Sequence, residues 1–389
     1  MGPTLPDISA MPSDHQHMMP WRADHVAAIG PVAPHAAPLI GRADLGGALP
    51  DLGLWDAWPI QNGDGSIFRL PDGSSLWMAL AAPWFDDPDD RHAHARIHLL
   101  LRRASGWRAL GPAMPDGFAP GSREWSGSAI MDDDGKALTL YFTAAGTRGE
   151  AQPTFGQRLF QARARLAERD GAPHLTDWRD LRESVVLDDS LYMDPLSGGG
   201  GIGTIKAFRD PGYFRDPVTG EAWLFFTGSR AGSASAFNGV IGAARRAEGS
   251  EDRWRIMPPL ISADGLNNEL ERPHVIRHDG LYYLFWSTQA HVFNPAGPIG
   301  PTGLYGMVSD RLQDGWRPLN GTGLVIANPP EAPRQAYSWL VLPDLSVTSF
   351  VDDWGHGADH AGPRRFGGTF APFVTLALDG TRAILKDAT

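Results

Sequence analysis

One carboxylate in this sequence lies between two tryptophans, in the run Trp55-Asp56-Ala57-Trp58. Indole rings stack on the C–H faces of sugars, and a carboxylate accepts hydrogen bonds from sugar hydroxyls. The run therefore favours a carbohydrate site. The alternative is a structural acid that caps a turn or pairs with an arginine, and this stretch alone fits both interpretations equally well.

Two further carboxylates have charged neighbours, with Asp210 directly after Arg209 and Glu271 directly before Arg272. Taken singly, each is readily explained as an ion pair with an arginine. Cleavage of a glycosidic bond, however, needs a proton donor for the leaving oxygen and a second carboxylate at the anomeric carbon. The sequence supplies these two carboxyl groups and a third one, with Asp56, Asp210 and Glu271 as the candidates.

The roles can be assigned from the neighbours of each acid. Glu271 is the proton donor, because Glu269 lies two residues away and faces the same side of a strand. A neighbouring negative charge raises the pKa of a carboxyl group and keeps it protonated near neutral pH. Asp56 is then the nucleophile, and Asp210 holds ring hydroxyls through hydrogen bonds that tighten as charge develops.

The alternation of a strand places one constraint on this site. Arg209 and Asp210 are adjacent, so a regular strand would point them to opposite faces. Both reach one pocket only if the strand ends or forms a bulge there, and we expect that it does.

The elements that position these acids form a loose repeat. Five short apolar strands, each after a turn containing Gly or Asp, recur at intervals of roughly 60 to 85 residues: 73–80, 135–142, 220–226, 280–286 and 344–350. A polar and aromatic segment precedes each strand: 55–58, 124–128, 208–211, 269–273 and 335–339. Small sheets repeated at this period predict an all-β, five-bladed β-propeller with a central axial pocket. A pair of β-sandwiches is the structural alternative.

Residues 157–168 give conflicting local signals. Their composition favours a helix, but apolar and polar side chains alternate from Phe160 to Leu166. Period two is typical of a strand, and we give it more weight than propensity.

Composition excludes several classes of protein. The chain has 389 residues and no cysteine, which excludes disulfides and thiolate metal sites. Its formal net charge is −11 without a basic block, so we expect no nucleic-acid partner. No apolar run approaches the roughly 18 residues needed to span a membrane, so no membrane partner is expected.

The N-terminal region has no periodicity and no secretory signal pattern. We expect an extended arm over residues 1–40, packed on a single catalytic propeller over residues 41–389. We interpret the clustered histidines as loop or surface residues rather than metal ligands, because no set of acids accompanies them: His15, His17, His92, His94 and His98.

In this order the segments resemble glycoside hydrolase family 68, which contains levansucrases, inulosucrases and bacterial β-fructofuranosidases. The stretch 55–62 is similar to the family's nucleophile motif, 124–129 to its sugar-binding motif, 209–211 to its transition-state stabiliser and 269–272 to its general acid segment. The stretch 21–24 is also family-like. The resemblance runs from about residue 21 to the end of the chain.

The resemblance implies a five-bladed propeller and a retaining reaction on sucrose, with a covalent fructosyl intermediate on Asp56. Glu271 would protonate the departing glucose and later act as base, and Asp210 would bind fructose hydroxyls. The other residues it places at the donor site are Trp55, Trp125, Ser126, Arg209, Glu269 and Tyr337. The fructosyl group then passes to water or to a sugar, giving a hydrolase or a fructan synthase.

Two positions depart from the family pattern. Gln289, with His291 nearby, stands where the family usually has Arg or His on the glucose or acceptor side. A neutral amide orients an acceptor differently from a cation, which argues against efficient polymer synthesis. Asn268 stands where calcium-binding members carry Asp, so the resemblance is to the Gram-negative, calcium-independent type, with no metal or other cofactor.

Two other interpretations of the sequence are also open. One is an inverting furanosidase of a related five-bladed family, and another is a non-catalytic sugar-binding propeller. The partners that we expect are sucrose and fructosyl acceptors, and the chain is expected to be a monomer or homodimer. It is expected in the cytoplasm, or secreted without a standard signal peptide.

Overall fold

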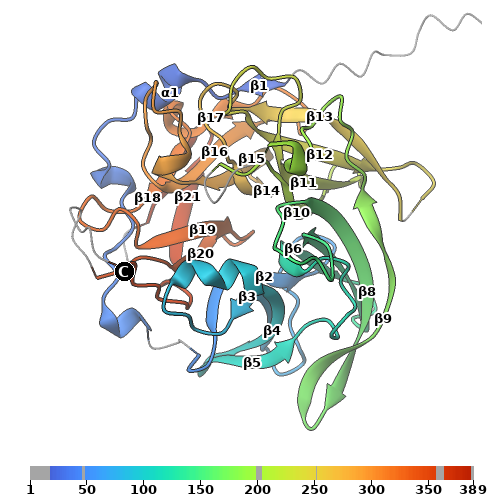
Figure 1. Ribbon diagram of the computed structural model, residues 1–389. Coiled ribbons are helices and arrows are strands. Elements are labelled where there is room, and N and C mark those ends of the chain that lie inside the picture. Colours follow the sequence, from blue (N-terminus) through green and yellow to red (C-terminus); the bar gives the residue numbers. More distant parts are fainter. Residues whose placement is uncertain (1–17, 46–48, 199–203, 251, 356–362, 387–389) are drawn as a thin grey trace, which may run out of the picture.

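Five blades of curled β-sheet surround one axis, so the predicted five-bladed β-propeller is confirmed (Figure 1). The computed structural model describes residues 18–45, 49–198, 204–250, 252–355 and 363–386. Each blade is built from consecutive strands that pair antiparallel. The first strand of every blade lies nearest the middle in Figure 1, and these five strands contain all or most of each polar and aromatic segment.

The first two blades are joined into one sheet, because β2 pairs parallel with β6 at Ile60↔Ala129 and Gln61↔Ile130. Blade 1 consists of β2 (Gly53–Gln61), β3 (Ser75–Ala82), β4 (Arg96–Arg103) and β5 (Gly106–Pro112). Blade 2 consists of β6 (Arg123–Met131), β7 (Ala137–Ala145), β8 (Gln157–Arg169) and β9 (Ala172–Val185). The strand predicted over residues 157–168 is therefore confirmed as β8.

The remaining blades follow the same plan. Blade 3 consists of β10 (Phe208–Arg215), β11 (Ala222–Ser229), β12 (Gly239–Arg246) and β13 (Trp254–Ser262). Blade 4 consists of β14 (Glu271–His278), β15 (Leu281–Thr288), β16 (Gly303–Ser309), β17 (Arg317–Pro318) and β18 (Leu324–Ala327). Blade 5 consists of β19 (Ala336–Val341), β20 (Ser346–Val351), β21 (Val374–Asp379) and β22 (Arg382–Leu385).

The five strands predicted from the repeat are the second strands of the blades: β3, β7, β11, β15 and β20. Their apolar composition follows from their position, because both faces of a second strand are covered by neighbouring blades. Trp77 on β3, Trp223 on β11 and Trp286 on β15 are almost completely buried. Such a strand reads as a continuous apolar run rather than an alternating one.

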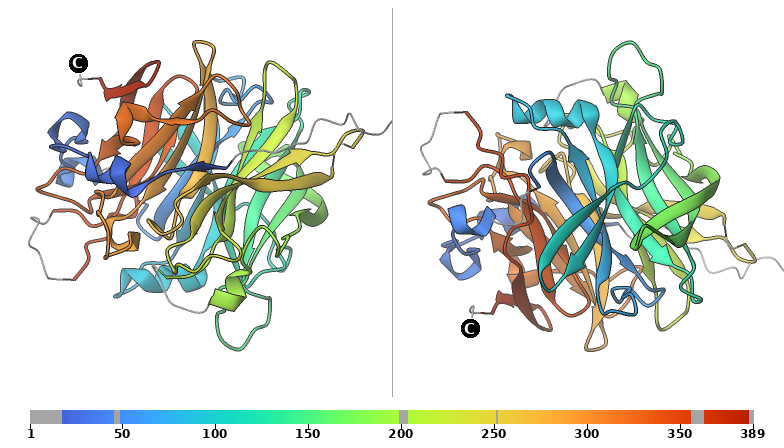
Figure 2. Two further views of the ribbon diagram at one scale, coloured as in Figure 1. Left: turned by 90° about the horizontal axis from the view of Figure 1, so that it is seen from above. Right: turned by 90° about the horizontal axis from the view of Figure 1, so that it is seen from below.

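The segment before blade 1 runs along the outer rim of the ring, past blades 3 and 4 (Figure 1; Figure 2, left). Its strand β1 (Met19–Pro20) pairs parallel with β13, and the short helix α1 (Ala23–Ala27) follows. Trp21 is buried, donates from Nε1 to the Thr322 carbonyl at 3.0 Å and packs edge-on against Trp286. Residues 1–17 of the expected arm lie outside the described residues.

Candidate active site

The pocket on the propeller axis brings together nearly all the site residues predicted from the sequence. It is lined by Trp55, Asp56, Trp125, Arg209, Asp210, Glu269, Glu271, Gln289 and Tyr337. Ser126 does not line it, but its hydroxyl donates to Asp210 Oδ1 at 2.7 Å. Four of the five blades therefore contribute a carboxylate or an indole, and the fifth contributes Tyr337 on β19.

A bulge interrupts every innermost strand at the level of this pocket. The register breaks are Trp55/Trp58, Trp125/Gly127, Arg209/Gly212, Glu271/His274 and Tyr337/Leu340. A bulge inserts a residue and turns side chains off the alternation of the strand. The predicted irregularity at Arg209 and Asp210 is thus confirmed, and it recurs in all five blades.

Four residues in these bulges have left-handed backbone conformations although none is glycine. Their φ angles are 44° at Asp56, 62° at Asp210, 50° at Arg272 and 59° at Ser338. Such conformations are unfavourable for residues with a Cβ and persist only where the surroundings enforce them.

A hydroxyl from the preceding blade supports three of the bulges. The Asp210 amide donates to Thr143 Oγ1 at 2.8 Å, and the Arg272 amide donates to Thr227 Oγ1 at 3.2 Å. The Trp339 amide donates to Ser287 Oγ at 2.9 Å. Because each acceptor lies on a second strand, the fully packed β7, β11 and β15 fix the backbone of the neighbouring catalytic strand.

Asp56 lies where burial and charge compete. Burial raises the pKa of Asp56 to about 6, and the nearby Asp210 and Glu271 add to the rise. Arg272 and a hydrogen bond from Ser338 oppose it. A carboxylate in this balance is ionised at neutral pH yet poorly solvated, as suits a nucleophile.

Asp210 is held by two hydroxyls rather than by solvent. Ser126 donates to Oδ1 at 2.7 Å, and Thr227 Oγ1 lies 3.3 Å from Oδ2. Burial raises the pKa of Asp210, and Arg209 opposes the rise. These contacts fix the carboxylate orientation before any ligand arrives.

Arg209 lies among three carboxylates. Its Nη2 is 2.7 Å from Glu271 and 3.4 Å from Glu269, and its Nε is 3.5 Å from Asp210. Tyr337 donates its hydroxyl proton to the other oxygen of Glu271. Both oxygens of Glu271 therefore accept a hydrogen bond from a protein side chain.

The prediction that Glu269 and Glu271 face the same side of one strand is wrong. Arg209 lies between the two carboxylates, and Glu269 precedes β14 instead of lying on it. Burial raises the pKa of Glu269 to about 7, with Arg209 opposing and Glu271 adding to the rise. The sequence showed the spacing of the two acids but not the cation between them.

Asn268 connects Glu269 to a buried ammonium group. Lys206 Nζ donates to Asn268 Oδ1 at 2.7 Å, to Asn238 Oδ1 at 2.9 Å and to the Ala236 carbonyl. Asn268 Nδ2 in turn donates to Glu269 Oε1 at 3.2 Å. The ammonium group of Lys206 thus connects the segments around Glu269 that contain Ala236, Asn238 and Asn268.

One wall of the pocket was not predicted from the sequence. The 3₁₀ helix η3 (Pro88–His94) and the connection after β20 contribute Asp89, Arg91, His92 and Arg364. Arg364 bonds to Asp89 at 2.6 Å and to Asp352. These residues lie in irregular connections, where no periodicity or motif signals a pocket.

The interpretation of the clustered histidines was partly wrong. His98 is buried on β4, and His92 lines the pocket with its ring edge toward Trp55, whereas His94 is exposed. His15 and His17 lie outside the described residues. Among the residues that the structure describes, no three His, Asp or Glu side chains gather as metal ligands would.

None of the described helices is long and apolar enough to cross a lipid bilayer.

A tryptophan-walled pocket on a propeller axis, with carboxylates from three blades, defines a carbohydrate-active propeller. The chain matches the family described as levansucrase/invertase over residues 13–238 and 232–389. It is 32% identical over 375 residues to levansucrase LscA of Pseudomonas savastanoi pv. glycinea, with 86% of each chain covered. It is 32% identical over 378 residues to the levansucrase of Erwinia amylovora, again with 86% of each covered.

A solved structure agrees with this match. The inulosucrase of Halalkalicoccus jeotgali, bound to kestose, aligns with a TM-score of 0.86 at 34% identity and covers 95% of both chains. The chain therefore belongs to the levansucrase/invertase family and is an enzyme of the glycoside hydrolase and fructosyltransferase class.

Proposed function

We propose that this enzyme cleaves sucrose and transfers its fructosyl group with retention, through a covalent ester on Asp56. The observation that carries the proposal is the convergence of Asp56, Asp210 and Glu271 on one pocket. The relatives named as levansucrases, and the inulosucrase solved with kestose, support a fructosyl donor.

In the first step Asp56 attacks the anomeric carbon of the fructosyl group. The bond from that carbon to the glucosyl oxygen breaks, and Glu271 gives its proton to the departing oxygen. A protonated Glu271 still offers lone pairs to Arg209 and Tyr337, which hold the carboxyl group in place. Asp210 accepts hydrogen bonds from fructosyl hydroxyls as positive charge develops on the ring.

In the second step Glu271 acts as base. It takes a proton from water or from an acceptor hydroxyl, the oxygen attacks the anomeric carbon, and the ester bond to Asp56 breaks. Gln289 and His291 line the same pocket. They lie on the acceptor side in this proposal, and the neutral amide favours hydrolysis over polymer synthesis.

Sugar release from sucrose tests the proposal directly. Free glucose and free fructose are measured over time with the purified enzyme, and Asp56→Asn serves as the inactive control. Equal release indicates a hydrolase, and glucose in excess of fructose indicates transfer. If the wild-type enzyme releases neither sugar, sucrose is not the donor and the proposal is overturned.

The anomeric configuration of the first product separates this proposal from an inverting furanosidase. NMR spectra taken within the first minutes of reaction should show β-fructofuranose, the configuration of the donor, because two displacements restore it. An initial α-anomer would contradict the ester on Asp56 while leaving glycoside hydrolysis in place.

A further inference from the structure

Lys206 is a buried cation that the proposed chemistry does not use. It precedes β10 and does not line the active-site pocket. An ammonium group has three N–H donors, and those of Lys206 reach Asn268 Oδ1 at 2.7 Å, Asn238 Oδ1 at 2.9 Å and the Ala236 carbonyl. All three acceptors are neutral. Because a buried charge persists only where its surroundings compensate it, the network beyond these acceptors must contain an anion.

That anion is Glu269, and Asn268 lies between the two charges. An ammonium group can only donate, so Asn268 must turn Oδ1 toward Lys206 and Nδ2 away from it. Nδ2 then donates to Glu269 Oε1 at 3.2 Å and to the Ile205 carbonyl at 3.1 Å. The amide dipole therefore runs from the cation to the carboxylate, and each hydrogen bond polarises the next. We call Lys206, Asn268 and Glu269 the Lys206 relay.

The Lys206 relay accounts for an asparagine at position 268. An aspartate could accept from Lys206, but it has no donor for Glu269 and would add a second negative charge beside it. The backbone amide of Asn268 donates to the Val292 carbonyl at 2.9 Å, on the 3₁₀ helix η5 (Ala290–Val292). Contacts with two partners thus fix the position of Asn268 and the direction of its amide.

The contacts of Glu269 show what the Lys206 relay holds in place. The Glu269 backbone amide donates to Asn267 Oδ1 at 2.8 Å, and Asn267 Nδ2 donates to Thr288 Oγ1 at 2.9 Å. Its carboxylate has Asn268 beside Oε1 and Arg209 Nη2 at 3.4 Å from Oε2. Without the Asn268 contact, the carboxylate could rotate about Arg209 in the pocket that it lines.

We propose that Lys206 is a positioning residue that acts through Asn268 to hold the Glu269 carboxylate in the orientation that receives the donor sugar. The inference rests on the proposed function, because that function assigns the pocket to sucrose. Lys206 precedes blade 3, whereas Asn268 and Glu269 precede blade 4. The Lys206 relay therefore joins two connections between blades at the point where they enter the site.

Ionisable groups from several elements face Glu269, and the test must separate Lys206 from them. These groups are Lys206 before β10, Arg209 and Asp210 on β10, Glu271 on β14 and Tyr337 on β19. Burial raises the pKa of Glu269 to about 7, and Arg209 and the hydrogen bond from Asn268 oppose the rise. Loss of that hydrogen bond, or of the ammonium group that directs it, should raise this pKa further.

The first test needs no substrate. The unfolding free energy of each protein is compared with that of its Glu269→Gln partner across pH, which reports the ionisation of Glu269 by linkage. Because the pKa of Glu269 is raised on folding, its contribution to stability falls from about pH 4.5 and levels off above about pH 7. In the Lys206→Met and Asn268→Ala backgrounds it should level off about one pH unit higher. An unchanged levelling pH in both backgrounds overturns the inference, even if the enzyme cleaves sucrose.

The double variant Lys206→Met/Asn268→Ala tests whether Lys206 acts through Asn268. It should shift the levelling pH no further than Asn268→Ala alone, because that substitution already interrupts the Lys206 relay. Two shifts that add would mean that the ammonium group acts on Glu269 directly through space, and the positioning role would be overturned.

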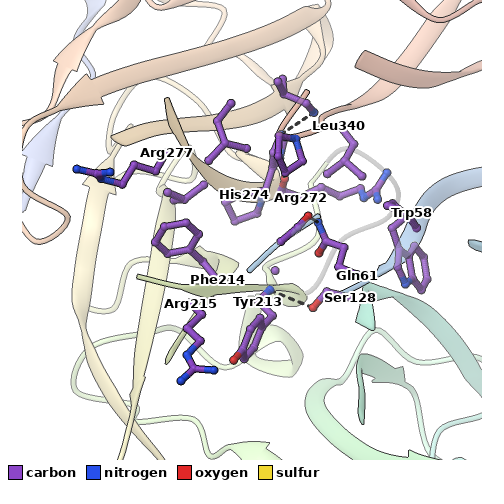
Figure 3. Close-up of a pocket in the computed structure, with 18 of the residues that line it drawn as sticks. Trp58, Gln61, Ser128, Tyr213, Phe214, Arg215, Arg272, His274, Arg277 and Leu340 are labelled. Atoms are coloured by element: carbon purple, nitrogen blue, oxygen red, sulfur yellow. Dashed lines mark hydrogen bonds between the residues drawn. The ribbon is translucent and has the colours of Figure 1, made fainter. Parts of the chain in front are cut away.

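Two further variants control for loss of packing and loss of charge. Asn238→Ala removes an acceptor of the same ammonium group but leaves Asn268 Nδ2 on Glu269. Arg277→Met removes a cation from a second pocket on the axis, which Figure 3 shows and which Glu269 does not line. Asn238→Ala should lower the melting temperature, and neither variant should move the levelling pH. A shift in Asn238→Ala as large as that in Lys206→Met would indicate general loosening and overturn the inference.

Steady-state kinetics connect the Lys206 relay to donor binding. Lys206→Met should raise KM for sucrose about tenfold and change kcat less than about threefold, because a misplaced Glu269 weakens the ground state and the transition state alike. Asn238→Ala should keep a KM near that of the wild type. A lower kcat with an unchanged KM would overturn the role in donor binding. If the wild type releases no sugar from sucrose, the proposed function fails, and the pH linkage still decides whether Lys206 controls Glu269.

Discussion

The backbone amide of Asp210 donates a 2.8 Å hydrogen bond to the hydroxyl of Thr143, which lies on the second strand of the preceding blade. Thr143 is completely buried, and its own hydroxyl lies 3.3 Å from the Ser126 carbonyl. The conformation of Asp210 therefore depends on a residue that does not line the pocket.

Thr143→Val tests this dependence. Valine has nearly the same shape but accepts no hydrogen bond, so the buried Asp210 amide loses its partner. We expect a loss of about 1–3 kcal/mol in the free energy of unfolding. We also expect kcat to fall by up to about a hundredfold, because a small displacement of Asp210 misplaces its hydrogen bonds to the transition state.

Thr139→Val is the control for this prediction. Thr139 lies four residues earlier on the same face of β7 and is partly exposed. The Thr139→Val substitution should change neither the free energy of unfolding nor kcat appreciably. Equal effects of the two variants on kcat would show that the hydroxyl of Thr143 has no special role.

Asp56→Asn and Glu271→Gln should differ in their response to the leaving group. Without its proton donor, Glu271→Gln should lose about 10²–10⁴-fold in kcat on sucrose. It should recover most of its rate on an aryl β-fructofuranoside whose phenolate leaves without a proton. Asp56→Asn should stay inactive on both donors. Recovery of Asp56→Asn on the aryl donor would contradict the assignment of the nucleophile.

Glu269→Gln should stabilise the protein at neutral pH but not at pH 4.5. The pKa of Glu269 is raised from 4.5 to about 7 in the folded state, so folding favours its protonated form. Its contribution to stability is present below pH 4.5 and is lost as the pH rises through 7. At about 1.4 kcal/mol per pH unit, the variant should gain on the order of 3–4 kcal/mol by pH 8.

The measurement is the difference in unfolding free energy between the variant and wild type, taken at several pH values. The wild-type profile alone is insufficient because buried histidines act with the opposite sign. Burial lowers the pKa of His92, His98 and His274 to about 4. Their neutral forms stabilise the fold above pH 6.5, and this contribution is lost as the pH falls toward 4. A pH-independent difference would show that Glu269 titrates normally.

Gln289→Arg should increase the share of fructose that is transferred to sugars. A guanidinium group offers five donors in a fixed geometry, so it can orient an acceptor hydroxyl more firmly than an amide does. The ratio of free glucose to free fructose should rise, with the missing fructose in oligosaccharides. Gln289→Met, which has no donors, should leave the ratio near that of simple hydrolysis. An unchanged ratio in the arginine variant would place Gln289 outside the acceptor side.

The three carboxylates and the fold could be predicted because both depend on local signals. Asp56, Asp210 and Glu271 each lie just ahead of an apolar second strand, and the repeat itself indicates which strands face the axis. The strand over residues 157–168 was also predictable, because alternation outweighed helix propensity once its partner strands were present.

The bulges and the charges between the acids could not be predicted in detail. Ser338 and Arg272 have left-handed backbones without the glycine or asparagine that usually signals one. Their conformations are enforced by contacts between blades, which have no sequence pattern. Arg209 was known to be near Asp210, but its place between Glu269 and Glu271 depends on how two blades meet.

The buried Trp21 has a consequence for synthesis of the chain. The residue whose carbonyl accepts its Nε1 proton lies 301 positions later in the sequence. At about 5–20 residues per second, the ribosome needs about 15–60 seconds to make that partner after Trp21 emerges. Throughout that interval an apolar indole stays exposed on a nascent chain, so its binding site completes only when most of the protein has been translated. Docking of this segment is therefore among the last events of folding, although it is made before any of the five blades.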